Sequence, residues 1–262
     1  MGTLVCFHAH PDDEAIATGG TMAKAAAAGH RVVLVVATGG EFGETPEDLA
    51  DGETLMDRRR AETERSSQGL GVSRIVWLGY QDSGMVGWTQ NEDPASFHQA
   101  SLDEAAERLA DILREEAADV LTTYDWHGNY GHPDHVKVHH VGHLAARLAG
   151  TPTVYEATMN REHIARLMEM AREAGGVDEE RIQTDDGNPF GMSEADLTTA
   201  VDVTAHLDVK KSALRAHASQ ITDTSFFLTM EADVFAMAFG TEWFIRRDAP
   251  AGIHEHDLRG LA

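Results

Sequence analysis

The residues best suited to chemistry lie near the start of the chain, where a histidine and three acids gather within a few positions. The segment AHPDDE spans residues 9–14 and follows an apolar run over residues 4–7. Imidazole nitrogen and carboxylate oxygen are ligands that zinc and similar divalent metals accept. We therefore expect His10 and Asp13 to bind a metal. Asp12 is then a spare carboxylate beside the metal, the position of a general base that activates a water.

A second polar cluster, later in the chain, favours this metal interpretation. By itself the first cluster leaves a simpler role open, because acids in front of a helix also act as N-caps. The segment HPDH over residues 132–135 repeats the His-Pro-Asp pattern, again after an apolar run and again at the start of a helix. Two such clusters predict one site to which both contribute ligands.

The spacing leaves open which histidines of the second cluster bind the metal. His132 and His135 stand at the expected start of the helix, and His139 and His143 follow His135 at intervals of one helical turn. His135 with His139 is therefore a rival ligand pair. The later histidines also suit a helix face that contacts solvent or the core.

Alternating strands and helices are predicted to carry these clusters. Short runs rich in Val and Leu separate longer segments with helical periodicity, a pattern typical of a parallel sheet with helical crossovers. We expect strands over residues 4–7, 31–37, 74–78, 119–123 and 153–157, and helices over residues 14–28, 55–70, 102–118 and 133–149. Both clusters then follow strands, at the sheet edge where open α/β folds bind ligands.

The predicted fold class is α/β, with a Rossmann-like, mostly parallel sheet flanked by helices and a smaller C-terminal extension that shapes the pocket. The glycine pattern of a dinucleotide-binding turn does not occur. We expect a metal-binding core over residues 1–160, an extension over 161–248 that completes the same domain, and a flexible tail over 249–262. Within the extension, we expect a helix over residues 160–174, an exposed loop over 175–189, a strand over 202–204, a helix over 206–220 and an apolar segment over 226–237.

Composition argues against several classes of protein. Of the 262 residues, 44 are acidic and 21 are Lys or Arg, and the net charge of −23 argues against nucleic acid or anionic lipid as a partner. No apolar run approaches the roughly 18 residues of a transmembrane segment, and the N-terminus lacks the pattern of a secretory signal. Cys6 is the single cysteine, so we expect a cytoplasmic protein without an intrachain disulfide.

With these motifs in place, the chain resembles the LmbE/PIG-L family of metal-dependent N-deacetylases. The resemblance rests first on AHPDDE and on the downstream HPDH. It extends to TGGE (38–41), RRAE (59–62), LGV (70–72), LGYQDSGM (78–85) and, more weakly, Lys211 with HASQ (217–220), and so covers about residues 3 to 220. The family includes deacetylases of N-acetylglucosaminyl-phosphatidylinositol and of the mycothiol and bacillithiol precursors.

The resemblance implies a zinc-dependent enzyme that removes an N-acetyl group from a glucosamine-containing small molecule. It implies metal ligands at His10, Asp13 and His135, with Fe(2+) or another divalent metal as the alternative to Zn(2+). A zinc-bound water would attack the acetyl carbon after Asp12 takes its proton. The resemblance further implies that His132 aids the tetrahedral intermediate or protonates the amine, with Asp134 orienting it and favouring its charged form, and that Tyr130 helps to hold the oxyanion.

Substrate recognition follows from the same resemblance. Arg59 and Asp82 match positions that bind sugar hydroxyls or a phosphate-bearing portion, and Glu41 is a further wall residue; Arg60 replaces Arg59 if the helix register differs. One alternative function is an amidase acting on a larger amide, such as a thiol conjugate or an acylated natural product. The other is a non-catalytic metal- or sugar-binding protein. A homo-oligomer is left open.

Overall fold

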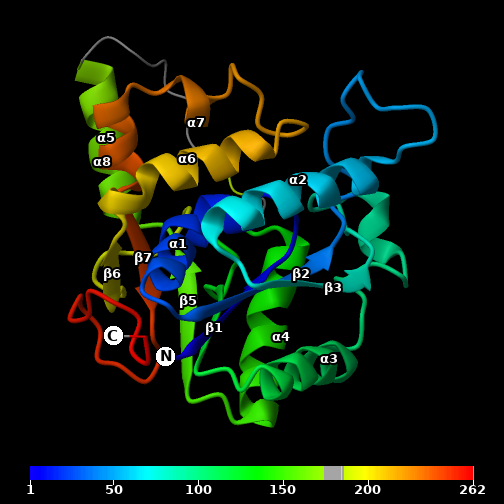
Figure 1. Cartoon of the computed structure of the whole chain (residues 1–262), viewed down its shortest axis with the longest axis horizontal. Coiled ribbons are helices and arrows are strands. Elements are labelled where there is room, and N and C mark those ends of the chain that lie inside the picture. Colours follow the sequence, from blue (N-terminus) through cyan, green and yellow to red (C-terminus); the bar gives the residue numbers. More distant parts are fainter. Residues whose placement is uncertain (174–183, 185, 262) are drawn as a thin grey trace.

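A seven-stranded sheet forms the centre of the computed structural model, which describes residues 1–173, 184 and 186–261 (Figure 1). The strand order is β3-β2-β1-β4-β5-β7-β6, and β7 runs antiparallel to both of its neighbours while β1 to β5 are parallel. The strands are β1 (Thr3–His8), β2 (Arg31–Thr38), β3 (Arg74–Tyr80), β4 (Val120–Tyr124), β5 (Thr153–Thr158), β6 (Thr199–Asp202) and β7 (Thr241–Ile245). The predicted α/β class with a mostly parallel sheet is confirmed.

Helices cover both faces of this sheet (Figure 1). One face carries α1, α2 and α6, the other carries α3 and α4, and the remaining helices gather near the β6–β7 end. The helices are α1 (Gly19–Ala27), α2 (Leu55–Leu70), α3 (Leu102–Glu115), α4 (Pro133–Ala149), α5 (Arg161–Glu173), α6 (Leu207–Ala216), α7 (Phe226–Thr229) and α8 (Ala232–Phe239). No helix within the described ranges combines the length and the apolarity needed to cross a bilayer.

The complete burial of two central strands, β1 and β2, explains why the sequence pattern predicted them. Residues 4–7 of β1 and 32–37 of β2 are fully buried. Helices pack on both sides of these strands, so each strand is a continuous apolar run rather than an alternating one. Thr3 pairs with Arg31, and this parallel register continues to His8.

The strand order places both polar clusters at the same edge of the sheet. From β1 the chain winds outward through β2 and β3, and then returns to β4 on the other side of β1. The loops that follow β1 and β4 therefore diverge, which is the point where open α/β sheets bind ligands. The first cluster follows His8, the last residue of β1, and the second follows Tyr124, the last residue of β4.

The segment after the first cluster differs from the continuous helix expected over residues 14–28. A π-helical turn, η1 (Glu14–Thr18), comes first, and α1 begins only at Gly19. The Glu242 carboxylate accepts hydrogen bonds from the backbone N–H groups of Gly20 and Thr21, both at 2.7 Å. This carboxylate caps a new helix start from 222 residues away, which explains why local sequence did not reveal it.

The C-terminal extension also differs in detail. The expected strand over residues 202–204 lies earlier, at β6, and the expected helix over 206–220 ends at Ala216 in α6. Strand β7 was not predicted. It is short, and the alternating burial of its residues arises from its pairing with β5 and β6. The loop expected over 175–189 lies partly outside the described residues.

The last residues of the chain, expected to form a loose tail, make specific contacts. Leu258 is buried, and Glu255 accepts hydrogen bonds from Arg246, Tyr155 and Thr199. Partial burial opposes the change, but these donors lower the pKa of the Glu255 carboxyl below its usual value. Such a group stabilises the fold above the pKa of the unfolded state, and this contribution disappears as pH falls through the lowered pKa.

Glu255→Gln is therefore expected to lower stability by about 1 kcal/mol at pH 7, since the carboxylate loses charge-assisted hydrogen bonds but is partly exposed. The difference in Tm between wild type and variant should be largest at pH 7 and should shrink below about pH 4.5. Thermal melts at several pH values measure it. A pH-independent difference would contradict the ionic explanation.

Candidate metal centre

The loops after β1 and β4 bring the predicted metal ligands together. Asp13 lies between the two histidines, with its Oδ2 3.5 Å from His10 Nδ1 and its Oδ1 3.5 Å from His135 Nε2. The rings of His10 and His135 are 5.3 Å apart at their centroids, and both side chains are buried. Two nitrogens and a carboxylate therefore face one small volume, although 122 residues separate Asp13 from His135.

The hydrogen bonds around the histidines fit a divalent metal. His135 Nδ1 lies 3.2 Å from the Gly128 carbonyl oxygen, so Nδ1–H donates and Nε2 carries the lone pair. That Nε2 is buried and has no hydrogen-bond partner among the described residues, although a buried polar atom without a partner is costly. His10 Nε2 lies 3.2 Å from Asp134 Oδ2, which leaves Nδ1 facing Asp13. Histidines that bind metals are held in this way by an outer partner.

The charges of the cluster also favour a cation. Burial alone would lower the pKa of His10, but Asp82, Asp13 and Asp134 together raise it well above its usual value. Burial alone would raise the pKa of Asp13, but His135 and His10 lower it. Several buried carboxylates thus surround the two rings, and a divalent ion would compensate their charge.

Asp12 stands beside this volume in an unusual backbone conformation. Its φ is +90°, a region that residues with side chains rarely adopt. Its Oδ2 lies 3.2 Å from Arg59 Nη2. Burial raises the pKa of Asp12 to about 6, against the opposing charge of Arg59. A carboxylate with a pKa near neutrality suits proton transfer.

Arg59 lies behind Asp12 rather than in open space for a substrate. Its guanidinium donates to the carbonyl oxygens of Pro11 and Gly40, at 2.5 and 2.8 Å, and its side chain is buried. Arg59 therefore supports the turn that carries Asp12, and its contact with a substrate stays a prediction. Arg60, the alternative, stacks over Trp77 at 5.1 Å and points elsewhere.

His132 lies at the first position of the second cluster, as the N-cap of α4. Its Nδ1 accepts the backbone N–H of Asp134 at 3.1 Å, so the ring proton of a neutral His132 is on Nε2. Its ring lies 4.7 Å from that of His10. Burial, together with the charges of His10 and His135, lowers the pKa of His132 to about 2. A neutral His132 presents its Nε2–H as a donor, and the charged form that the resemblance implies stays a prediction.

The Asp134 side chain serves partners other than the His132 ring that the sequence predicted. It is completely buried and accepts hydrogen bonds from the Ser83 hydroxyl and the Ser83 backbone N–H as well as facing His10. Asp134 thus positions His10 and attaches the loop after β3. The sequence assigned no role to Ser83, and no local signal pairs two residues 51 positions apart.

The remaining predicted residues form walls of the same site. Asp82 is buried, lies 3.5 Å from His10 Nε2 and accepts the backbone N–H of Gly84. Glu41 accepts the Asp82 backbone N–H at 3.1 Å, so these two acids join the loops after β2 and β3. The Tyr130 ring lies 5.0 Å from that of His135 on the second loop. All ten predicted site residues therefore lie in or next to one cluster of side chains.

The rival ligand His139 belongs to a separate cluster, further along α4. Its Nδ1 lies 2.9 Å from the Tyr124 carbonyl oxygen, and it groups with His143 and Glu156. Arg247 already pairs with Glu156 in this cluster. His139 therefore faces a different set of groups from Asp13. The histidine of α4 that Asp13 contacts is His135.

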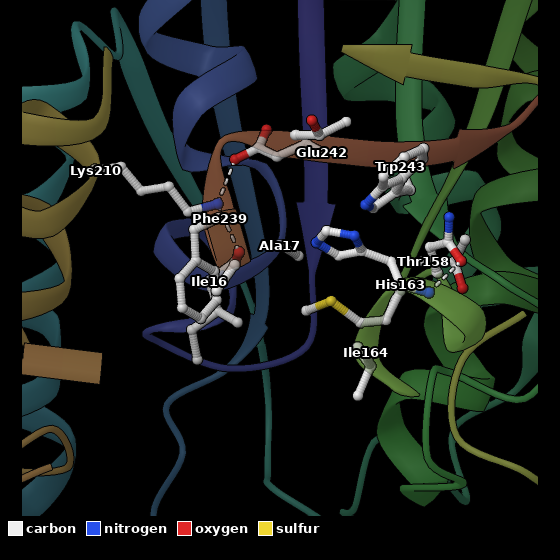
Figure 2. A pocket seen from close by; sticks show the side chains of 13 residues that line it. Ile16, Ala17, Thr158, His163, Ile164, Lys210, Phe239, Glu242 and Trp243 are labelled. Carbon is white, nitrogen blue, oxygen red and sulfur yellow. Dashed lines mark hydrogen bonds and ion pairs between the residues drawn. The ribbon is translucent and has the colours of Figure 1, made fainter. Parts of the chain in front are cut away.

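A cavity also lies on the other side of η1, between α5, α8 and β7 (Figure 2). Its lining includes Ile16 and Ala17 from η1 and His163 from α5. Lys210 and Glu242 face each other at 2.5 Å on one wall, and Lys210 also donates to the Ile16 carbonyl oxygen. Lys210 and Glu242 therefore hold the backbone of η1 and α1.

Comparisons with known proteins agree with this geometry. The family model described as "PIG-L: GlcNAc-PI de-N-acetylase" matches residues 5–146. The chain is 39% identical, over 95% of its length and 91% of the relative, to a 1D-myo-inositol 2-acetamido-2-deoxy-alpha-D-glucopyranoside deacetylase from Thermomonospora curvata. It is 40% identical to the deacetylase of the same name from Acidothermus cellulolyticus, over 93% of this chain and 88% of the relative.

Solved structures show the same architecture. The N,N'-diacetylchitobiose deacetylase from Pyrococcus horikoshii superposes with a TM-score of 0.60 and 26% identity, covering 93% of this chain and 83% of that one. A deacetylase of teicoplanin biosynthesis gives a TM-score of 0.63 at 19% identity, covering 94% of this chain and 99% of that one, which shows a shared fold.

Proposed function

Because the chain belongs to the PIG-L family of de-N-acetylases, we propose that it hydrolyses the N-acetyl group of a glucosamine-containing small molecule. The inositol glycoside of N-acetylglucosamine named for its relatives is the first candidate substrate. The observation that carries this proposal is the convergence of His10, Asp13 and His135 next to the Asp12 carboxylate, which Arg59 contacts at 3.2 Å.

We propose Zn(2+) as the metal, because two imidazoles and one carboxylate are the donors of many catalytic zinc sites and leave a position for water. Fe(2+) is the alternative. Zinc held there would lower the pKa of a bound water and polarise the acetyl carbonyl. A cytoplasmic location is also proposed, since Cys6, the single cysteine, is buried as a free thiol.

The residues of the chain divide the proton chemistry between them. Asp12 accepts a proton from the attacking water, and Arg59 holds the Asp12 carboxylate in place. His132 donates from Nε2 to the oxygen that becomes negative as the carbonyl carbon turns tetrahedral. Asp12 then returns the proton to the glucosamine nitrogen as the C–N bond breaks, so that water and amide yield acetic acid and an amine. One proton passes from the acid to the amine, which leaves acetate and an ammonium group.

A substrate panel tests the proposal. The purified chain is loaded with zinc and assayed for acetate release from the inositol glycoside, from free N-acetylglucosamine and from an N-acylated thiol conjugate. We expect release to be fastest from a glucosamine compound. Fastest cleavage of the conjugate would support the larger-amide alternative. Metal binding without release from any compound would support a binding protein instead.

His132→Ala is expected to lower kcat by about 10²-fold or more while metal content stays unchanged, because the ring supplies a donor and not a ligand. His143→Ala is the matched control, because His143 lies in α4 but outside the cluster of His10, Asp13 and His135. It should keep normal kcat. Metal analysis and steady-state kinetics measure both. Loss of metal from His132→Ala would instead make His132 a ligand. The ring nitrogens of His10, His132 and His135 lie close enough together to hold one ion.

A further inference from the structure

We propose that Glu14 and His217 form a buried positioning pair, which holds the backbone of Asp12 in its left-handed conformation and so aims the Asp12 carboxylate at the metal cluster. The proposal rests on the proposed function only in assigning proton transfer to Asp12. Neither Glu14 nor His217 lies among the predicted ligands or bases, and both side chains are completely inaccessible to solvent.

The hydrogen bonds of Glu14 connect three distant parts of the chain. Its Oε2 accepts the backbone N–H of Asp12 at 3.0 Å. Its Oε1 accepts from Ser66 Oγ in α2 and from His217 Nε2 just after α6, both at 2.6 Å. Each of these partners is a donor, so the ionised form is the one that the site accommodates.

The Asp12 backbone needs such support. A φ of +90° on a residue with a side chain is strained by about 1 kcal/mol or more and persists only where the surrounding structure determines it. The Asp12 carbonyl oxygen accepts from Ala15 and Ile16, and its carboxylate pairs with Arg59. Glu14 supplies the acceptor for the remaining group, the N–H. The peptide before Asp12 is then held at both ends, with its Pro11 carbonyl oxygen on Arg59 and its N–H on Glu14. Without the Glu14 hydrogen bond only the Arg59 contact restrains this peptide, and the carboxylate direction changes as the peptide tilts.

His217 offsets the free-energy cost of burying the Glu14 carboxylate. An ionised carboxylate without water is costly unless it is paired and hydrogen-bonded. His217, 203 residues away, supplies that partner at the end of α6. A pair that served only to join α2 and α6 would not need a carboxylate oxygen on the Asp12 N–H. Glu62 provides a comparison, because this buried carboxylate of α2 accepts from the N–H and hydroxyl of Ser219 rather than from the catalytic turn.

A double-mutant cycle on kcat separates positioning from general stability. Glu14→Gln keeps the size of the side chain but replaces one acceptor by a donor. We expect it to lower kcat by about 10- to 100-fold with KM changed less than about twofold, since small misplacement of a catalytic group is costly. In the Asp12→Asn background the same change should lower kcat by less than about threefold. The control Glu62→Gln should show the same factor in both backgrounds.

Two further readouts keep the test independent of folding failure and of the substrate. His217→Gln retains an N–H donor near the position of Nε2 and should keep most of the kcat that His217→Leu loses. Amide hydrogen exchange of Asp12, followed by NMR, should be slow in the wild type, faster in Glu14→Gln and unchanged in Glu62→Gln.

The outcomes are distinguishable. If the wild type releases no acetate from the substrate panel, the proposed function fails, and the Asp12 exchange rate still decides the positioning role. Unchanged exchange of the Asp12 amide in Glu14→Gln overturns the proposal, as does an equal effect on kcat in both backgrounds. If Glu14→Gln does not fold, the exchange rate in His217→Gln and His217→Leu decides, and an equal Asp12 rate in both overturns it.

Discussion

Asp12→Asn is expected to reduce kcat by about 10²- to 10⁴-fold while the metal stays bound, because asparagine has nearly the same shape but does not accept a proton. Asp12 pairs with Arg59, and Asp13, its neighbour, is the predicted ligand. KM should change little, since the substitution keeps the shape of the side chain and leaves its neighbours in place. Steady-state kinetics and elemental analysis of the same preparation measure both effects.

The control for this variant is Asp57→Asn, at an exposed position in the first turn of α2. This variant makes the same chemical change outside the predicted metal cluster and should leave kcat unaltered. An Asp12→Asn enzyme with near-normal kcat would remove Asp12 as the base. The base would then have to be sought among the other carboxylates near His10. Two of these, Asp82 and Asp134, already accept hydrogen bonds from the backbone N–H groups of Gly84 and Ser83.

His10→Ala is expected to release the metal and with it the activity. The substitution removes one of the nitrogens that face Asp13 and leaves only two predicted ligands, which is too few for a catalytic zinc site. Metal content should fall from about one ion per chain toward zero, and added zinc should restore activity only at much higher concentration. Equilibrium dialysis with zinc, followed by elemental analysis, measures the change.

His143→Ala again provides the comparison, because it removes a histidine from the second cluster on α4. It should keep both metal and activity. If instead His143→Ala released the metal and His10→Ala kept it, the ion would belong with His139 and Glu156, and the ligand set at Asp13 would be wrong.

The sequence by itself determined the parts of this protein that depend on local pattern. The strands expected over residues 4–7 and 31–37 were recognisable because a strand covered on both faces is a nearly continuous apolar run, which here covers residues 4–7 and 32–37. His10, Asp12 and Asp13 were recognisable because they lie within a few residues of one strand end, and ends of parallel strands share an edge. The second cluster followed from the same rule, so that the fold class and the proximity of the two clusters were both predictable.

Only the tertiary structure decided what each side chain faces. Arg59 pairs with Asp12, Asp134 binds Ser83 and His10, and Glu14 pairs with His217 across 203 positions. A buried charge must find its partner wherever the packed chain offers one, and that partner carries no signal at a fixed sequence distance. The start of α1, set by Glu242 from β7, has the same cause. Motif spacing therefore brought together the groups that we predict to react, whereas long-range packing determined how their side chains are oriented and held.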